Sequence, residues 1–160
     1  GKVDAGVTGE SGLLLIHQGR VAQLPGASAM ELKILGPGAT LTTTRRSIGR
    51  DRDGVMQFMR AYVETVHYFK TNREGSVRAL QKYLRAATPE QIAVLYEEQR
   101  DITEPLPLPS EEAIQAVLDR ESDPKAKTFK PADFLDVSFL REIERSGFLA
   151  ELYSKGSSPR

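Results

Sequence analysis

The side chains best suited to bind a small anion lie close together near residue 45. Three threonines, Thr42–Thr44, are followed by a basic cluster of four arginines: Arg45, Arg46, Arg50 and Arg52. A guanidinium group can hold a carboxylate, a sulfonate or a phosphate through two parallel hydrogen bonds. The alternative is a solvated turn in which Asp51 and Asp53 balance the positive charge. Both interpretations are open at this point.

Two polar segments lie at the carboxyl ends of predicted strands. In open α/β sheets, ligands dock at these strand ends. The hydroxyl groups of Thr42–Thr44 are the first, although side chains alternate along a strand, so only one or two of them can face one cleft. The second is Thr8–Ser11, which ends a strand and begins a helix, so its backbone N–H groups could bind an anion. Both segments are equally well explained as ordinary strand ends.

Residue combinations typical of catalysis or of metal binding are missing from the sequence. No nucleophile lies beside a base within one motif, and Gly36–Gly38 lacks the Lys-Ser/Thr pair of a phosphate-binding loop. There is no cysteine, and the two histidines, His17 and His67, are far apart. His67 falls on the polar face of a helix, where a solvated side chain is expected. The sequence therefore predicts a protein that is not an enzyme and has neither a metal nor a cofactor.

Residues 51–154 are predicted to be almost continuously helical. Apolar residues at spacings of three and four indicate a long amphipathic helix with one buried stripe: Val55, Phe58, Met59, Tyr62, Val66 and Phe69. Thr71 and Glu74 have the spacing of a capping box that would open a second helix. Thr88, with Pro89 and Gln91 after it, predicts the start of a third.

The last third of the chain is punctuated by prolines and polar residues. The proline-rich residues 104–109 form a connector, and Ser110 after it caps a further helix. Asp123–Lys130 is predicted to be a polar loop. A final helix presents Phe139, Leu140 and Ile143 to a core, and Gly147 is expected to end it in a left-handed conformation.

Strand-like runs are confined to the first fifty residues. Val3–Val7, Leu32–Leu35 and Ala39–Thr44 are short, apolar or β-branched and bounded by glycine or proline. Ser11–Gln18 can form a helix that ends at Gly19, so the chain begins as an α/β protein. Three short strands cannot cover several amphipathic helices. Either the helices pack as a bundle, or the chain is the second half of a larger α/β protein.

Composition narrows the class of partner. The 160 residues contain 22 Lys plus Arg and 22 Asp plus Glu, so the net charge is zero and nucleic acid is not an expected partner. No apolar run approaches the roughly 20 residues of a membrane span. The first residues, Gly1–Asp4, contain neither a methionine nor a signal peptide. We therefore expect the chain to begin inside a longer protein.

Several segments, in the same order, match one known family. They are Gly1–Ala5, Thr42–Ile48, Val55–Glu64, His67–Asn72, Pro107–Ser110, Asp133–Asp136 and Ser146–Phe148. Together they resemble the C-terminal half of ABC-transporter solute-binding proteins of the nitrate, sulfonate, taurine and thiamine-pyrimidine-precursor type. The resemblance extends over nearly the whole chain.

The resemblance implies an α/β fold: the helix-rich C-terminal half of a two-lobed periplasmic-binding-protein-like (type II) structure. Residues 1–38 would belong to the second lobe, 39–50 to a crossover segment, 51–154 to helices that pack on a first lobe encoded upstream, and 155–160 to a tail. The implied ligand-facing residues are Thr8, Gly9, Glu10, Thr42, Thr43 and Arg45. Gly9–Ser11 departs from the family, whose members often have serine and proline there.

The implied function is capture of a small organic or anionic solute between the lobes, for delivery to an ABC permease in the membrane. The protein would be periplasmic or extracytoplasmic, and a monomer at full length. Two alternatives stay open. One is an enzyme of the same fold that makes a pyrimidine precursor, which would need a reactive lysine or histidine and a cysteine-rich stretch upstream. The other is a free-standing helical interaction module.

Overall fold

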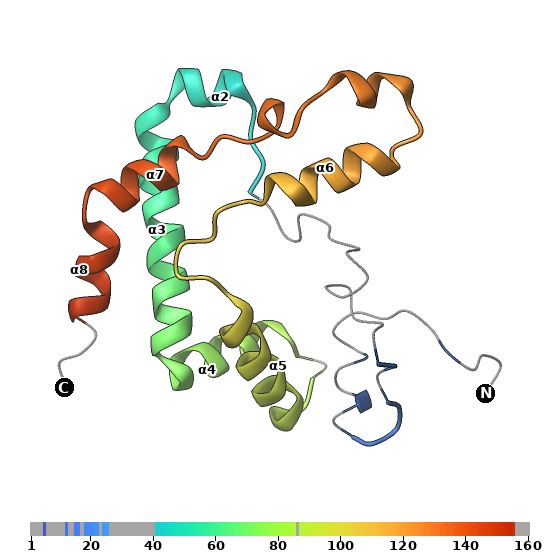
Figure 1. The fold of residues 1–160 in the computed structure, drawn as a ribbon. Coiled ribbons are helices and arrows are strands. Elements are labelled where there is room, and N and C mark those ends of the chain that lie inside the picture. The colour runs from blue at the N-terminus through green and yellow to red at the C-terminus, as the bar shows by residue number, and fades with distance from the viewer. Residues whose placement is uncertain are drawn as a thin grey trace.

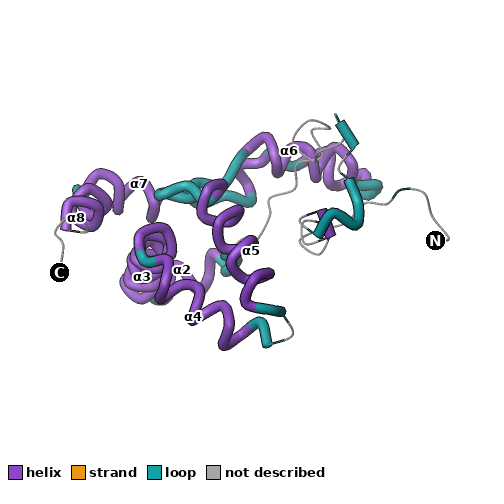
Figure 2. Tube along the Cα trace, turned by 90° about the horizontal axis from the view of Figure 1, so that it is seen from below, coloured by secondary structure: helices purple, strands orange, loops and turns teal. Residues whose placement is uncertain are grey.

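The computed structural model is rich in helix. It describes residues 5, 12, 15–16, 18–22, 24–25, 41–85 and 87–155. Within these ranges seven α-helices and two short 3₁₀ helices have defined bounds, and no residue lies in a strand (Figure 2). The predicted strand Ala39–Thr44 is wrong over its described part, because Leu41–Thr44 pairs with no neighbouring strand. The predicted strands Val3–Val7 and Leu32–Leu35 lie outside the described residues, apart from Ala5, which is not in a strand.

Helices α2 (Arg45–Arg50) and α3 (Arg52–Thr71) meet at a sharp corner. Asp51 makes that corner: its backbone leaves the helical region, with φ −147° and ψ 71°, and its carboxylate accepts a hydrogen bond from the Gly54 N–H. Helix α3 is the longest of the described helices and runs from α2 at one end to α4 at the other (Figure 1). The long helix was predicted correctly, whereas α2 was not foreseen.

Helices α4 (Arg73–Tyr83) and α5 (Pro89–Ile102) pack together at the C-terminal end of α3 (Figure 1). The capping box at the start of α5 is confirmed, with the Thr88 hydroxyl accepting from the Gln91 N–H and the Gln91 side chain accepting from the Thr88 N–H. The predicted cap of α4 is wrong by one residue, because Asn72 rather than Thr71 accepts from the Gly75 N–H.

Helix α6 (Glu111–Arg120) and the 3₁₀ helices η1 (Pro124–Thr128) and η2 (Pro131–Asp133) form a separate arm (Figure 1). Ser110 caps α6, as predicted, by accepting from the Ala113 N–H. The loop predicted for Asp123–Lys130 is wrong in detail. The Asp123 carboxylate accepts from the Lys125 N–H and begins η1, so this polar stretch makes a tight helical turn.

Helices α7 (Ser138–Arg145) and α8 (Phe148–Lys155) both pack against α3. Gly147 joins them with a φ of 77°, a left-handed conformation that favours glycine, so the predicted C-cap is confirmed. A second left-handed glycine, Gly19 with a φ of 67°, follows the helical residues Leu15 and Ile16 and confirms the predicted end of that turn.

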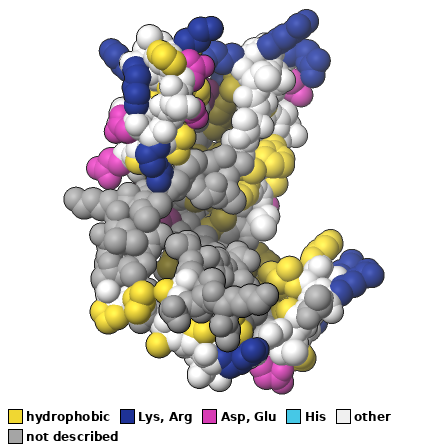
Figure 3. Space-filling model, turned by 90° about the vertical axis from the view of Figure 1, so that its right-hand side faces the viewer, with side chains coloured by type: hydrophobic (Ala, Val, Ile, Leu, Met, Phe, Trp, Pro, Cys, Tyr) yellow, Lys and Arg dark blue, Asp and Glu magenta, His cyan; other side chains and the backbone are white. Residues whose placement is uncertain are grey.

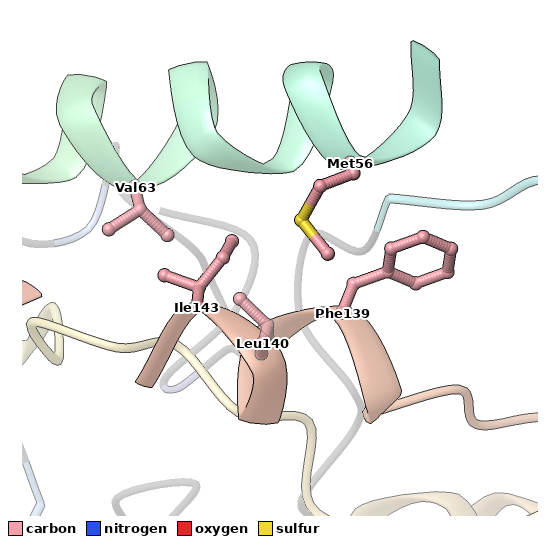
Figure 4. Close-up of a cluster of buried hydrophobic side chains, with 5 residues drawn as sticks. All are labelled: Met56, Val63, Phe139, Leu140 and Ile143. Atoms are coloured by element: carbon pink, nitrogen blue, oxygen red, sulfur yellow. The ribbon is translucent and has the colours of Figure 1, made fainter. Parts of the chain in front are cut away.

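The main hydrophobic core lies between α3 and α7. Met56 and Val63 of α3 face Phe139, Leu140 and Ile143 of α7, and Figure 4 shows these five side chains pointing into the space between the two helices. The three α7 residues were predicted to face a core, and all three are buried. The stripe predicted for α3 is partly wrong, because Met56 and Val63 are buried while Phe58 is 56% exposed.

A considerable set of large apolar side chains is open to solvent. On α3 and at the end of α4 these are Phe58, Tyr68, Tyr83 and Leu84, and on the α6 arm Val117, Phe129 and Phe134. Figure 3 shows hydrophobic side chains at the surface of one face of the molecule. Over the part of the chain that the structure describes, no helix has the length and apolar character needed to cross a membrane.

Candidate functional site

The predicted ligand-facing residues fall into two groups. Thr8, Gly9 and Glu10 lie outside the described residues. Thr42, Thr43 and Arg45 are described and exposed, at the entrance to α2. Their neighbour Thr44 is the N-cap of α2, because its hydroxyl accepts a 3.0 Å hydrogen bond from the Ser47 N–H. The third threonine is therefore committed to the helix start rather than to a ligand.

Arg45 reaches a segment that is 88 residues away in the sequence. Its Nη2 donates a 2.8 Å hydrogen bond to the backbone carbonyl oxygen of Asp133, at the end of η2. The Asp133 side chain has a separate role, since it accepts from the Lys130 N–H. Arg45 thus joins the start of α2 to the segment that leads into α7.

Arg52 makes a second connection between the same two regions. Its Nη2 lies 2.7 Å from Oε2 of Glu142, and its guanidinium group lies over the Phe139 ring, 4.9 Å from the centroid. The hydrogen bond from Arg52 to Glu142 raises the pKa of Arg52 above its ordinary value. Of the two carboxylates expected to balance the arginines, Asp53 adds to the rise in the pKa of Arg52, and Asp51 is the N-cap of α3.

Asp136 lies between the two connections. Its Oδ1 accepts hydrogen bonds from the Ser138 hydroxyl at 2.6 Å and from the Ser138 N–H at 3.0 Å. These hydrogen bonds, together with the charges of Arg52 and Arg45, hold the pKa of Asp136 below its ordinary value of 3.8. The carboxylate therefore stays ionised at neutral pH, within the electrostatic influence of both arginines.

We call the set Thr42–Arg45, Arg52, Asp133, Asp136 and Glu142 the corner site. It offers exposed hydroxyl groups and guanidinium N–H groups, which can hydrogen-bond a polar or anionic ligand. No metal-ligand cluster of three or more His, Cys, Asp or Glu side chains occurs among the described residues.

The acidic half of the corner site was not predicted from the sequence. In the sequence Asp133 and Asp136 are only part of a family-like segment, and no pattern points to Glu142. The nearest acidic residues in the sequence, Asp51 and Asp53, were the natural partners to assign to the arginines. A contact between residues 88 or 90 apart leaves no local pattern that could have revealed it.

The surroundings of the His67 side chain differ from those predicted. It was predicted to be a solvated surface residue. Its ring instead meets Tyr153 of α8 edge to face, with centroids 4.6 Å apart, and its Nε2 is buried with no hydrogen-bond partner. The contact between the two rings is therefore a packing contact.

Two apolar hollows are lined by described residues outside the set that forms the corner site. One, of about 410 Å³, opens on the α6 arm and is walled by Val117, Ala126, Phe129 and Phe134, with Glu121 and Asp123 among its lining residues. The other, of about 170 Å³, lies between α3 and α4, where Tyr68, Phe69, Leu80 and Tyr83 line it. Both hollows are formed partly by exposed aromatic side chains.

Comparison of this chain with protein-family models, with curated proteins and with solved structures finds no match. The sequence and the corner site therefore carry the information on function.

Proposed function

We propose that this chain is part of the solute-binding component of an ABC import system. It would form the helix-rich C-terminal half of a two-lobed α/β protein that captures a small organic or anionic solute, such as a sulfonate, nitrate, taurine or a pyrimidine. The observation that carries the proposal is the contact between Arg45 and the Asp133 carbonyl. It joins two of the family-like segments, Thr42–Ile48 and Asp133–Asp136, in one place with exposed hydroxyl groups.

The exposed apolar side chains support the proposed first lobe. Phe58, Tyr83 and Leu84 are 56%, 78% and 41% exposed, and they lie on α3 and at the end of α4. Exposed aromatic and aliphatic side chains of this size are what a covering body would bury. A first α/β lobe would bury these residues and would supply the sheet that the helices need.

Solute capture also agrees with the chemistry of the corner site. Binding needs a cleft with a few well-placed polar groups, and it needs no catalytic residue. In the proposed mechanism the two lobes close around the solute, and the permease recognises the closed form. The crossover residues Thr42, Thr43 and Arg45 would face the solute in a periplasmic or extracytoplasmic, monomeric protein.

A thermal-shift panel tests the proposal on the intact protein, meaning these residues together with the proposed first lobe. The panel contains taurine, other sulfonates, nitrate, pyrimidines and aromatic acids. A true solute present at a hundred times its Kd stabilises the folded state by about 2.7 kcal/mol, which raises the melting midpoint by several degrees. A flat response to every compound would argue against solute binding.

A helical interaction module is the second candidate, because no described residue lies in a strand. The two candidates differ in what the isolated 160-residue chain should do. As half of a two-lobed protein it exposes Phe58 and its neighbours, so it should aggregate or remain molten. As a free-standing module it should melt cooperatively as a monomer. A cooperative monomeric melt would therefore exclude the two-lobed assignment.

A further inference from the structure

The corner site also joins two parts of the chain that are far apart in the sequence. Its residues Asp133 and Glu142 contact Arg45 and Arg52, at the start of α2 and of α3. Residues 133–142 cross the junction of α2 and α3 and are attached there at two points. Arg45 donates to the Asp133 carbonyl at one end, and Arg52 pairs with Glu142 at the other. We call residues 133–142 the strap.

Apolar packing also holds the strap against α3. Phe139 and Leu140 are each 4% exposed and belong to the core between α3 and α7 (Figure 4). The Arg52 guanidinium group lies over the Phe139 ring, so the second attachment point rests directly on this core. A side chain held by both an ion pair and a ring has fewer accessible rotamers than a solvated arginine.

The polar attachments constrain the position of the strap more than they add to the stability of the fold. Arg52 and Glu142 are each about half exposed, and ion pairs of this kind contribute little to stability. Arg45, by contrast, bonds to a backbone oxygen whose position is set by the turn of η2. Asp136 adds a third constraint, since its carboxylate accepts hydrogen bonds from Ser138, at the start of α7, within the field of both arginines.

We propose that the strap holds the Thr42–Arg45 crossover in its binding orientation, and that Arg52 and Glu142 are positioning residues for it. This inference rests on the proposed solute-binding function, in which Thr42 and Thr43 face the solute. Because Arg45 is itself a candidate ligand-facing residue, the test relies on Arg52 and Glu142, which are not among the six implied ligand-facing residues and which pair with each other across the junction.

The experiment compares four variants of the intact protein: Arg52→Ala, Arg52→Lys, Glu142→Gln and the control Arg73→Ala. Arg73 lies on α4, forms an exposed ion pair with Glu97 at 2.6 Å and lies over the Tyr96 ring, 5.8 Å from the centroid, so its replacement removes the same kinds of contact away from the corner site. Two quantities are measured for each variant: the affinity for the compound that gives the largest thermal shift in the panel above, and the hydrogen–deuterium exchange of the Thr42–Ile48 amides without any compound.

Arg52→Ala and Glu142→Gln should weaken binding by about two- to fivefold, which is the scale of an exposed ion pair. Both should also speed exchange of the Thr42–Ile48 amides, while the unfolding midpoint stays close to that of the parent. Arg52→Lys should recover part of both effects, because it keeps the charge, and Arg73→Ala should change neither. A purely structural pair would shift the midpoint and leave the affinity of the folded protein unchanged.

The outcomes separate the strap from the function on which it rests. Unchanged exchange in Arg52→Ala and Glu142→Gln overturns the strap, whether or not a solute binds. Faster exchange without any change in affinity also overturns it as a positioning device. If no compound binds the parent protein, the solute-binding proposal fails, and the inference that the strap orients a binding segment falls with it.

Discussion

His67 of α3 and Tyr153 of α8 meet edge to face, with their ring centroids 4.6 Å apart and their planes at 84°. The contact fixes the last helix of the chain to the longest one. Phe148, at the start of α8, lies under the Arg60 guanidinium, so α8 is attached to α3 at both ends. The burial that this packing produces raises the pKa of the Tyr153 hydroxyl above its ordinary value of 10.0.

The first prediction concerns alkaline pH. Because the folded state holds the Tyr153 proton more tightly than the unfolded state, folding stability falls as the pH rises above the ordinary pKa of 10.0. Tyr153→Phe should reduce this alkaline loss, as measured by the melting midpoint on either side of that pH. Tyr83→Phe is the matched control, since Tyr83 is 78% exposed. Equal alkaline behaviour of the two variants would contradict the prediction.

The second prediction concerns Lys70, whose ammonium group closes the C-terminal end of α5. Its Nζ donates to the carbonyl oxygens of Arg100 and Thr103, at 2.7 Å and 2.6 Å. Lys70→Met keeps the aliphatic stem and removes both charged hydrogen bonds, which should lower the free energy of unfolding by about 1.5–3 kcal/mol. Urea denaturation of the intact protein measures the change.

Lys82→Met serves as the control for Lys70→Met. Lys82 is an exposed residue of α4 whose Nζ lies over the Tyr83 ring, 5.7 Å from the centroid. Its replacement should change the free energy of unfolding by no more than about 0.5 kcal/mol. Similar losses in both variants would show that the Lys70 hydrogen bonds contribute nothing specific.

The third prediction separates two neighbouring residues at the junction of α3 and α4. The Asn72 side chain accepts from the Gly75 N–H at 2.9 Å, whereas the Thr71 hydroxyl donates to the His67 carbonyl within α3. Asn72→Ala should therefore lower the free energy of unfolding by about 1 kcal/mol, the usual loss for an N-cap. Thr71→Ala should lower it by less than about 0.5 kcal/mol. The reverse order would restore Thr71 as the cap.

Local patterns predicted the helices well and the contacts between them poorly. Thr88, Ser110 and Gly147 act within a few residues of themselves, so the sequence alone identifies the helix ends that they make. Helix α2 was missed because its six residues include one large apolar side chain, Ile48, and therefore show no periodicity. Its N-cap, Thr44, was interpreted instead as part of a β-branched strand.

Only the threonines and arginines of the candidate site were predicted from the sequence, and their partners were not. Exposed threonines and arginines near residue 45 follow directly from the sequence, and the structure places them at the surface. Their partners, the Asp133 carbonyl and Glu142, depend on how the chain returns after the α6 arm. For the same reason His67 was expected to be solvated, because nothing near it in the sequence indicates that Tyr153 covers it.

The fourth prediction tests the proposed first lobe through Phe58, which is 56% exposed on α3. If a second body covers this face in the intact protein, Phe58→Ala should lower the free energy of unfolding by about 3 kcal/mol, as for a buried phenylalanine. Gln57→Ala, an exposed neighbour on the same helix, should change it by less than about 0.5 kcal/mol. A loss below about 0.5 kcal/mol for Phe58→Ala would leave this face open to solvent and weaken the two-lobed proposal.

The fifth prediction concerns acid pH and Asp136. Hydrogen bonds from Ser138 and the charges of Arg52 and Arg45 hold the pKa of Asp136 below its ordinary value of 3.8. The folded state therefore releases this proton more readily than the unfolded state, and the resulting stability is present above pH 3.8 and is lost as the pH falls through the lower, folded value. Asp136→Asn should reduce the acid sensitivity of the melting midpoint.

Asp53→Asn is the control, because it removes an exposed carboxylate from the same corner of the molecule. Raising the salt concentration should reduce the difference between Asp136→Asn and the parent only in part. Salt screens the two arginine charges, whereas the hydrogen bonds from Ser138 are short, at 2.6 Å and 3.0 Å, and are screened much less. If Asp136→Asn follows the parent through the acid range, Asp136 is not a charged member of the corner site, and the strap lacks its third constraint.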